Sequence, residues 1–150
     1  VFFFISILLI GAIGLAAINS RRSIDSPVRK VVTDATDATI FIEDVTIPDG
    51  TAIPVNTTFV KTWRVKNIGK LIWENRYLKR MTPLSNQICS SPTMVPIPKT
   101  LPGETVDISV TFTTPHLPGS CRTDGKSADQ NGNLHFPDKH GLFSIVSITE

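Results

Sequence analysis

Residues 105–113 read TVDISVTFT, a stretch in which polar and apolar residues alternate strictly. A period of two places Val106, Ile108, Val110 and Phe112 on one face of a β-strand, with the polar residues on the other face. One apolar and one polar face is typical of an antiparallel sheet that covers a core on a single side. This stretch therefore predicts a domain built from half-buried strands.

The same period of two recurs over residues 58–67. Phe59, Trp63 and Val65 share a face there and are expected to point into the core. Trp73 follows shortly after and is expected to pack inside as well, because an indole ring brings much apolar area to a core.

The last predicted strand, residues 142–148, changes phase along its length. Phe143 and Ile145 fall on one face, whereas Val146 and Ile148 fall on the other. Either a β-bulge or burial on both faces would explain this pattern.

Pairs of residues typical of turns recur through the chain after residue 40. They are Asp49-Gly50, Ile68-Gly69, Pro102-Gly103, Pro118-Gly119 and Asn131-Gly132. No stretch after residue 40 shows a helical period. Short strands and regular turns over roughly 110 residues predict one all-β domain, an immunoglobulin-like antiparallel β-sandwich over residues 40–150.

Residues 1–18 read VFFFISILLIGAIGLAAI and contain no charge. A helix of this length spans about 27 Å, just enough to cross the hydrocarbon core of a bilayer. We therefore expect one N-terminal transmembrane helix ahead of the sandwich. A cleaved secretory signal is the alternative, but the apolar stretch is long for a signal and its end is a poor cleavage site.

Residues 19–39 are polar and predict a flexible linker. Arg21, Arg22, Arg29 and Lys30 follow the apolar stretch, and basic residues beside a membrane span favour the cytoplasmic side. The cysteines argue for the opposite side, and an upstream segment with more positive charge would remove this conflict. We expect the domain to face outside, in the extracellular space or the cell envelope.

The chain contains two cysteines, Cys89 and Cys121. An even number in a domain that faces an oxidising compartment predicts one disulfide. Two unpaired thiols in a reducing compartment are the alternative. A metal site is the weakest reading, because no Cys and His lie at ligand spacing.

The sequence offers no catalytic constellation. His116, His135 and His140 lie in or beside predicted loops, without a nucleophile-elbow serine or a phosphate-binding glycine loop. A net charge of +2 and a charged fraction of 19% do not indicate nucleic-acid binding. We expect a domain that is not an enzyme and uses no cofactor or metal.

Four motifs follow one another in a fixed order. Residues 44–51 read DVTIPDGT, 59–69 read FVKTWRVKNIG, 101–110 read LPGETVDISV and 114–119 read TPHLPG. Together they resemble the four-tryptophan (FW) domain, the Ig-like central domain of the neighbour-of-BRCA autophagy receptors, over about residues 39–148. The motif positions are Phe59, Trp63, Asn67, Gly69, Trp73, Pro102, Gly103, Pro118 and Gly119.

This resemblance implies an immunoglobulin-like sandwich that binds proteins rather than catalysing a reaction. Bacterial proteins carry the domain too, often anchored to a membrane or secreted. Cys89 and Cys121 look like a bacterial variant in which a disulfide is common. The ligand of such variants is not implied by the resemblance.

Two of the four name-giving tryptophans are missing. Trp63 and Trp73 match the first two, whereas Gly125 stands near the third position and Phe143 near the fourth, as an aromatic substitute. If the third Trp belongs to the core, its loss costs about 3 kcal/mol unless the site is repacked. If it belongs to a binding surface, the ligand differs.

We therefore expect a non-catalytic, extracytoplasmic protein-binding module, tethered to the membrane through residues 1–18. Its binding surface is expected in the long loops, residues 83–98 and 128–141. One alternative is the external sensor domain of a transmembrane regulatory protein whose cytoplasmic part lies upstream. Another is a passive spacer in the envelope.

Overall fold

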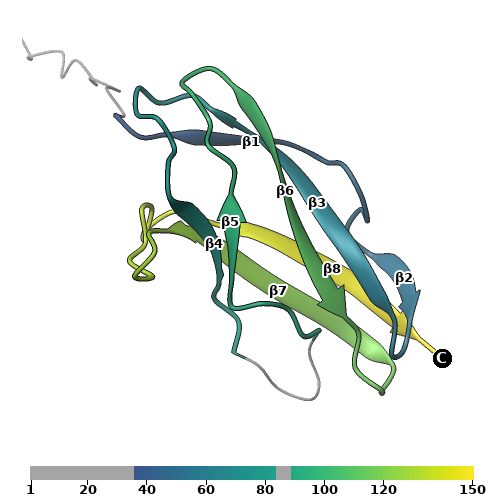
Figure 1. Ribbon diagram of the computed structural model, residues 1–150. Helices are drawn as coiled ribbons and strands as arrows, with labels where there is room; N and C mark the ends of the chain where they lie inside the picture. The colour runs from purple at the N-terminus through teal and green to yellow at the C-terminus, as the bar shows by residue number, and fades with distance from the viewer. Residues whose placement is uncertain (1–35, 84–88) are drawn as a thin grey trace, which may run out of the picture. The chain divides into compact units, whose positions relative to one another are not determined.

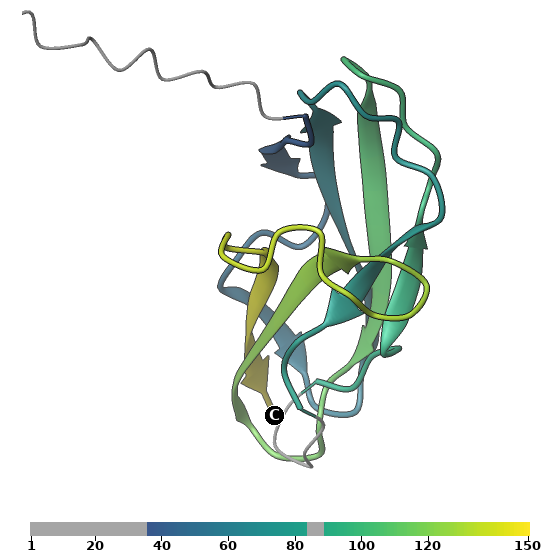
Figure 2. The ribbon, with the colours of Figure 1, turned by 90° about the vertical axis from the view of Figure 1, so that its left-hand side faces the viewer.

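The computed structural model describes residues 36–83 and 89–150, which form two facing β-sheets (Figures 1 and 2). The first sheet has the strand order β1-β3-β6, and the second has the order β2-β8-β7-β4-β5. The strands are β1 (Thr39–Asp44), β2 (Thr51–Pro54), β3 (Thr58–Asn67), β4 (Arg76–Arg80), β5 (Met94–Ile97), β6 (Thr105–Thr113), β7 (Gly119–Ala128) and β8 (Leu142–Thr149). The prediction of an all-β sandwich is confirmed. The apolar stretch of residues 1–18 and most of the predicted linker lie outside the described residues.

The sandwich is antiparallel with one exception. β2 pairs with β8 in parallel, from Thr51 opposite Val146 to Pro54 opposite Thr149, whereas the other described strand pairs are antiparallel. The chain therefore leaves the first sheet after β1, crosses to the second sheet as β2 and returns as β3. The predicted linker boundary at residue 40 falls inside β1.

β3 and β6 form the centre of the core, and their predicted faces are confirmed. They pair in continuous antiparallel register, with Trp63 opposite Ile108 and Phe59 opposite Phe112. Phe59 stacks on Phe112 with ring centroids 5.5 Å apart, and Trp63 meets the edge of Phe112 at 6.4 Å. Trp63 is only 3% exposed, so its indole ring lies in the core as expected.

The two faces predicted for β8 are confirmed, but neither a bulge nor burial on both faces explains them. β8 pairs with β7 without a register shift, from Gly119 opposite Ile148 to Gly125 opposite Leu142. Ser144 occupies a buried inward position between Leu142 and Val146, and the apolar Phe143 lies outward, 39% exposed. Because a small hydroxyl residue fills a core position, the apolar pattern of the sequence is interrupted although the strand is regular.

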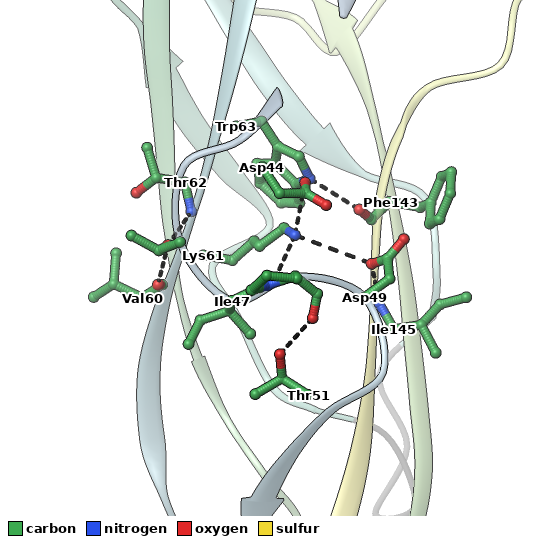
Figure 3. A network of polar contacts seen from close by, with 12 residues as sticks. Asp44, Ile47, Asp49, Thr51, Val60, Lys61, Thr62, Trp63, Phe143 and Ile145 are labelled. Atoms are coloured by element: carbon green, nitrogen blue, oxygen red, sulfur yellow. Dashed lines mark hydrogen bonds and ion pairs between the residues drawn. The ribbon is translucent and has the colours of Figure 1, made fainter. Parts of the chain in front are cut away.

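A buried ammonium group joins the segments that connect β1 to β2 (Figure 3). The side chain of Lys61 on β3 has no exposure to solvent, and its Nζ lies 2.7 Å from the carboxylate of Asp44. The same Nζ donates to the carbonyl oxygen of Ile47 at 2.6 Å and lies 5.6 Å from the Trp63 ring. A charge without water is tolerated only when it is paired and hydrogen-bonded, and these contacts meet that requirement.

The network continues into the second sheet. Asp49 lies 4.0 Å from Lys61 Nζ and accepts a hydrogen bond from the backbone N–H of Ile145 on β8. The indole Nε1 of Trp63 donates to the carbonyl oxygen of Phe143, also on β8, at 2.9 Å (Figure 3). Polar contacts thus connect the two layers of the sandwich.

The disulfide predicted between Cys89 and Cys121 is present. Both residues are buried, with Cys121 on β7, and the bond ties the segment before β5 to the second sheet. Closing a loop of this length stabilises the fold by about 3 to 4 kcal/mol in the chain-entropy account.

The start of the described chain is fixed against the end of β3. Asn67 is fully buried, and its side-chain amide donates to the carbonyl oxygens of Leu71 and Thr100 while its Oδ1 accepts from Gly69 N–H. A Cβ at Gly69 would lie 2.6 Å from the backbone nitrogen of Ala38, so only glycine lets the incoming chain pass this closely. The motif residues Asn67 and Gly69 therefore set where the chain joins the domain.

We predict that Lys61→Met lowers the free energy of unfolding by about 3 kcal/mol, because Asp44 and the Ile47 carbonyl lose a buried partner. Lys66→Met on the outer face of the same strand is the matched control and should change it by no more than about 0.5 kcal/mol. Urea unfolding followed by tryptophan emission measures both. Equal stability of the two variants would contradict the structural importance of the network.

Candidate functional site

An apolar cleft of about 170 Å³ opens between the two sheets on the side of β1. Every strand of the first sheet and four strands of the second contribute to its wall, together with the loop between β7 and β8. The lining residues are Thr39, Phe41, Val65, Trp73, Leu78, Ile97, Ile108, Gly125, Lys126, Ser127, Phe136, His140, Gly141 and Leu142. Figure 2 shows the loop between β7 and β8 on the same side of the domain as β1.

The rim of the cleft is an edge strand. No described strand pairs with the outer edge of β1, whose inner edge pairs with β3. Ile40, Phe41 and Ile42 on β1 are 47%, 50% and 46% exposed, and the register shifts between Phe41 and Glu43. An edge with unpaired backbone groups and exposed apolar side chains is a template for another strand, and the register shift limits how far such pairing extends.

Trp73 forms part of the inner wall and is 3% exposed, so its prediction as a packed residue is confirmed. Its Nε1 donates to Asp37 Oδ1 at 3.2 Å, and the guanidinium of Arg76 lies 5.5 Å from its ring. Asp37 also pairs with Arg76 at 2.8 Å. Arg76 is 6% exposed, and its Nη1 has no hydrogen-bond partner among the described residues.

Two glycines give the cleft its depth. A Cβ at Gly125 would meet Leu78 at 3.0 Å, and a Cβ at Gly141 would collide with the carbonyl oxygen of Gly125. Leu78 therefore occupies space next to the position where the resemblance places a third tryptophan. Partial filling by Leu78 leaves the cleft between the sheets instead of a closed core.

The mouth of the cleft carries positive charge. Lys126 and His140 line it, and a shallower hollow beside it shares both residues and adds Lys139. Lys126 Nζ donates to the carbonyl oxygen of Pro137 at 2.6 Å, which holds it beside the loop. Asp124 also lines the hollow, but it is paired with Arg122 at 2.8 Å.

His135 lies behind the cleft in the same loop. Its Nδ1 is 3.1 Å from the hydroxyl of Ser127, a lining residue. Burial, followed by the positive charge of Arg76, lowers the pKa of His135 below its usual value. The imidazole is therefore expected to be neutral at pH 7 and to support the loop rather than to carry charge.

Only part of the two predicted binding loops lies at the cleft. Residues 128–141 supply Phe136, His140 and Gly141 to the cleft, as expected for a functional loop. Of residues 83–98, Ile97 reaches the cleft, and residues 84–88 lie outside the described part of the chain. Sequence reasoning missed β1, and the only signal was the run of apolar residues 40–42.

The motif residues lie mostly away from the cleft. Pro102 and Gly103 form an exposed turn before β6, where Gly103 N–H donates to the Asn67 carbonyl at 2.8 Å. Pro118 and Gly119 form an exposed turn at the start of β7. Phe143, the expected aromatic substitute, lies on the outer face of the second sheet, where the Arg122 guanidinium is 4.7 Å from its ring.

Residues 36–83 and 89–150 contain no cluster of three or more His, Cys, Asp or Glu side chains that could hold a metal ion. The same residues include no helix long and apolar enough to cross a membrane.

Residues 46–145 match the family described as the Ig-like domain from next to BRCA1 gene. Protein ILRUN of Danio rerio is 32% identical over 110 residues, covering 73% of this chain and 37% of the relative. Protein JOKA2 of Solanum tuberosum is 34% identical over 96 residues, covering 61% of this chain and 11% of the relative. The chain thus spans just over a third of the length of the first relative and about a tenth of the second.

Solved structures of similar form share little sequence with this chain. A CARDB domain from Pyrococcus furiosus, solved in complex with di-metal ions, has a TM-score of 0.49 and 14% identity, covering 76% of this chain and 94% of that one. A β-glucosidase from Listeria innocua has a TM-score of 0.45 and 10% identity, covering 75% of this chain and 16% of that one. Neither likeness carries information about function.

We predict that protonation of His135 destabilises the domain. Because its folded pKa is lowered, its contribution to stability is complete above the unfolded value near 6.5 and is lost as the pH falls through the folded pKa. The thermal midpoint should therefore drop between pH 7 and 5, and less so in His135→Asn, which cannot be protonated. The pKa values of Asp107 and Asp129 are lowered as well, but protonation of these carboxylates reduces stability only below about pH 3.8, outside this window.

His116→Asn in an exposed loop is the matched control for this experiment. It should keep the pH slope of the parent protein. The same slope in His135→Asn as in the parent would contradict the assignment.

Proposed function

The chain belongs to the family of the Ig-like domain from next to BRCA1 gene, and on this premise we propose that it is a non-catalytic protein-binding module tethered to a membrane and facing an extracytoplasmic space. The observation that supports binding most directly is the apolar cleft beneath the free edge of β1. A partner that adds an extended segment to β1 gains main-chain hydrogen bonds, and one of its side chains can enter the cleft.

The chemistry of the cleft specifies the partner segment. Phe41, Trp73 and Leu78 offer an apolar surface, which favours an aliphatic or aromatic side chain. Lys126 lines the cleft and Lys139 lines the hollow beside it, so an acidic residue next to that side chain would be attracted. The proposed ligand is therefore an extended peptide segment with an apolar residue flanked by acidic ones.

Two features support the proposed tether and compartment. The uncharged stretch of residues 1–18 is long enough to cross a bilayer as a helix. The disulfide between Cys89 and Cys121 is typical of proteins that fold in an oxidising compartment. A membrane-anchored variant of the family, of the kind found in bacteria, combines both features.

Selection from a phage library of random peptides tests the binding proposal. We expect enriched peptides to share one apolar residue with acidic neighbours. Phe41→Ser should weaken binding of a selected peptide by about tenfold, as for an interface residue in a buried contact. Gly125→Leu, which fills the cleft, should abolish it.

Phe143→Ser is the matched control, because Phe143 is also an exposed aromatic residue but lies on the outer face of the second sheet. It should leave the affinity within about twofold, as expected for a residue outside the interface. If the selection yields no peptide that binds saturably, the passive spacer is favoured. If Phe41→Ser and Phe143→Ser weaken peptide binding equally, the binding surface lies elsewhere.

Thiol alkylation in the native host tests the location. We expect the intact chain in the membrane fraction, with Cys89 and Cys121 resistant to alkylation until a reductant is added. Recovery in the soluble fraction with both thiols reactive before reduction would contradict the tether and the compartment.

A further inference from the structure

The end of the sandwich at which the described chain begins exposes a cluster of aliphatic side chains. They are Ile68, Leu71 and Ile72 from the connection after β3 and Leu101 from the turn before β6, and they are 54%, 47%, 50% and 43% exposed. We name these four residues the apolar tip. Several exposed apolar residues at one end of a domain indicate a surface that contacts a membrane or another molecule.

Backbone hydrogen bonds bring the two connections that carry the apolar tip side by side. Trp73 and Thr100 exchange both backbone hydrogen bonds in an antiparallel bridge, at 2.9 and 3.0 Å. The residues that precede and follow this pair, Ile72 and Leu101, therefore lie opposite each other. Gly103 N–H reaches the carbonyl oxygen of Asn67, which brings the turn beside the start of the other connection.

The chain enters the domain at the apolar tip. The carbonyl oxygen of Thr36, the first described residue, accepts from the N–H groups of Lys70 and Leu71 at 2.9 and 3.1 Å, and Ala38 O accepts from Ile68 N–H at 3.1 Å. Figure 1 shows that the C-terminus lies at the opposite end of the sandwich. The described chain thus begins directly beside the exposed Leu71 and Ile72.

The charges at this end suit an apolar contact. Its carboxylates are each matched: Glu74 with Lys99 at 2.9 Å, Asp37 with Arg76 at 2.8 Å, and Glu104 with the backbone N–H of Leu101 at 2.8 Å. Lys66 on β3 adds a positive charge near this end. Because the carboxylates have partners, bringing this end to lipid headgroups costs less.

We propose that the apolar tip docks into the headgroup–acyl boundary of the membrane that carries the anchor. The inference rests on the proposed tether of residues 1–18. Residues 19–35 can separate the anchor from Thr36 by at most about 60 Å, even when fully extended. This connection keeps the tip at a high effective concentration near the bilayer, so four half-exposed side chains suffice to hold it.

The chain contains a matched pair of sites for the test. Leu101-Pro102-Gly103 at the tip and Leu117-Pro118-Gly119 at the opposite end are the same tripeptide, and their leucines are 43% and 50% exposed. The full chain is reconstituted into phosphatidylcholine vesicles that contain a brominated phosphatidylcholine, as Leu101→Trp or as Leu117→Trp. The emission of the added tryptophan is obtained by subtracting the spectrum of the parent chain, which contains Trp63 and Trp73.

We expect the added emission of Leu101→Trp to shift to the blue and to be largely lost through quenching by the brominated lipid. Leu117→Trp should keep a red, unquenched emission. Because the contact is apolar, the difference should persist when the salt concentration is raised. Introducing Leu71→Ser and Ile72→Ser together into Leu101→Trp should lower the ratio of docked to free domain by about tenfold for each side chain removed, and the emission should return.

Separate results overturn the tether and the docking. A chain that does not float with the vesicles overturns the tether, and this proposal with it. A chain that floats while Leu101→Trp stays as unquenched as Leu117→Trp overturns the docking alone, and is the result expected if a protein covers the tip. A far-UV circular dichroism spectrum and a thermal midpoint equal to those of the parent show that a variant is folded. The Leu71→Ser and Ile72→Ser substitutions test the same contact by removing apolar side chains, without adding a bulky one.

Discussion

The two layers of this sandwich depend on the ammonium group of Lys61, which is held where water cannot reach it. It fixes Asp44 at the end of β1 and lies near Asp49 just before β2, so that one side chain controls the segment that passes from the first sheet to the second. Asp49 then meets the backbone of β8, and the indole of Trp63 meets β8 from the other direction. Packing of apolar residues alone permits layers to slide, whereas buried polar contacts with defined partners specify one arrangement.

Alternation of apolar and polar residues predicts strand faces well only where every inward position is apolar. In β6 this condition holds, and the predicted core face agrees with the structure. In β8 it fails because Ser144 points inward, and in β3 the inward Lys61 is stable only through carboxylates that no local pattern connects to it. The family motifs support the same sandwich from other residues, such as Asn67, Gly69 and Gly103, which act in turns and where the incoming chain passes closely. The cleft escaped prediction because its wall comes from separate strands whose pairing the sequence does not state.

Most of the motif residues shape the turns and the chain entry, whereas other residues shape the cleft. Asn67 and Gly69 determine how the chain enters, and Gly103 continues that arrangement at the neighbouring turn. Gly125 marks a departure, because Leu78 takes part of the space and the remainder stays open between the layers. The residues that fix the chain entry and the neighbouring turn thus differ from the positions that leave the cleft open.

The parallel pair of β2 and β8 has a consequence for biosynthesis. Thr51 meets Val146, so β2 cannot pair with β8 until roughly a hundred further residues have been made. A ribosome exposes residues in order, and contacts between distant segments form late and slowly. Synthesis must therefore pass β8 before the sandwich can close. Until then the nascent chain carries unpaired strand edges that need protection from aggregation.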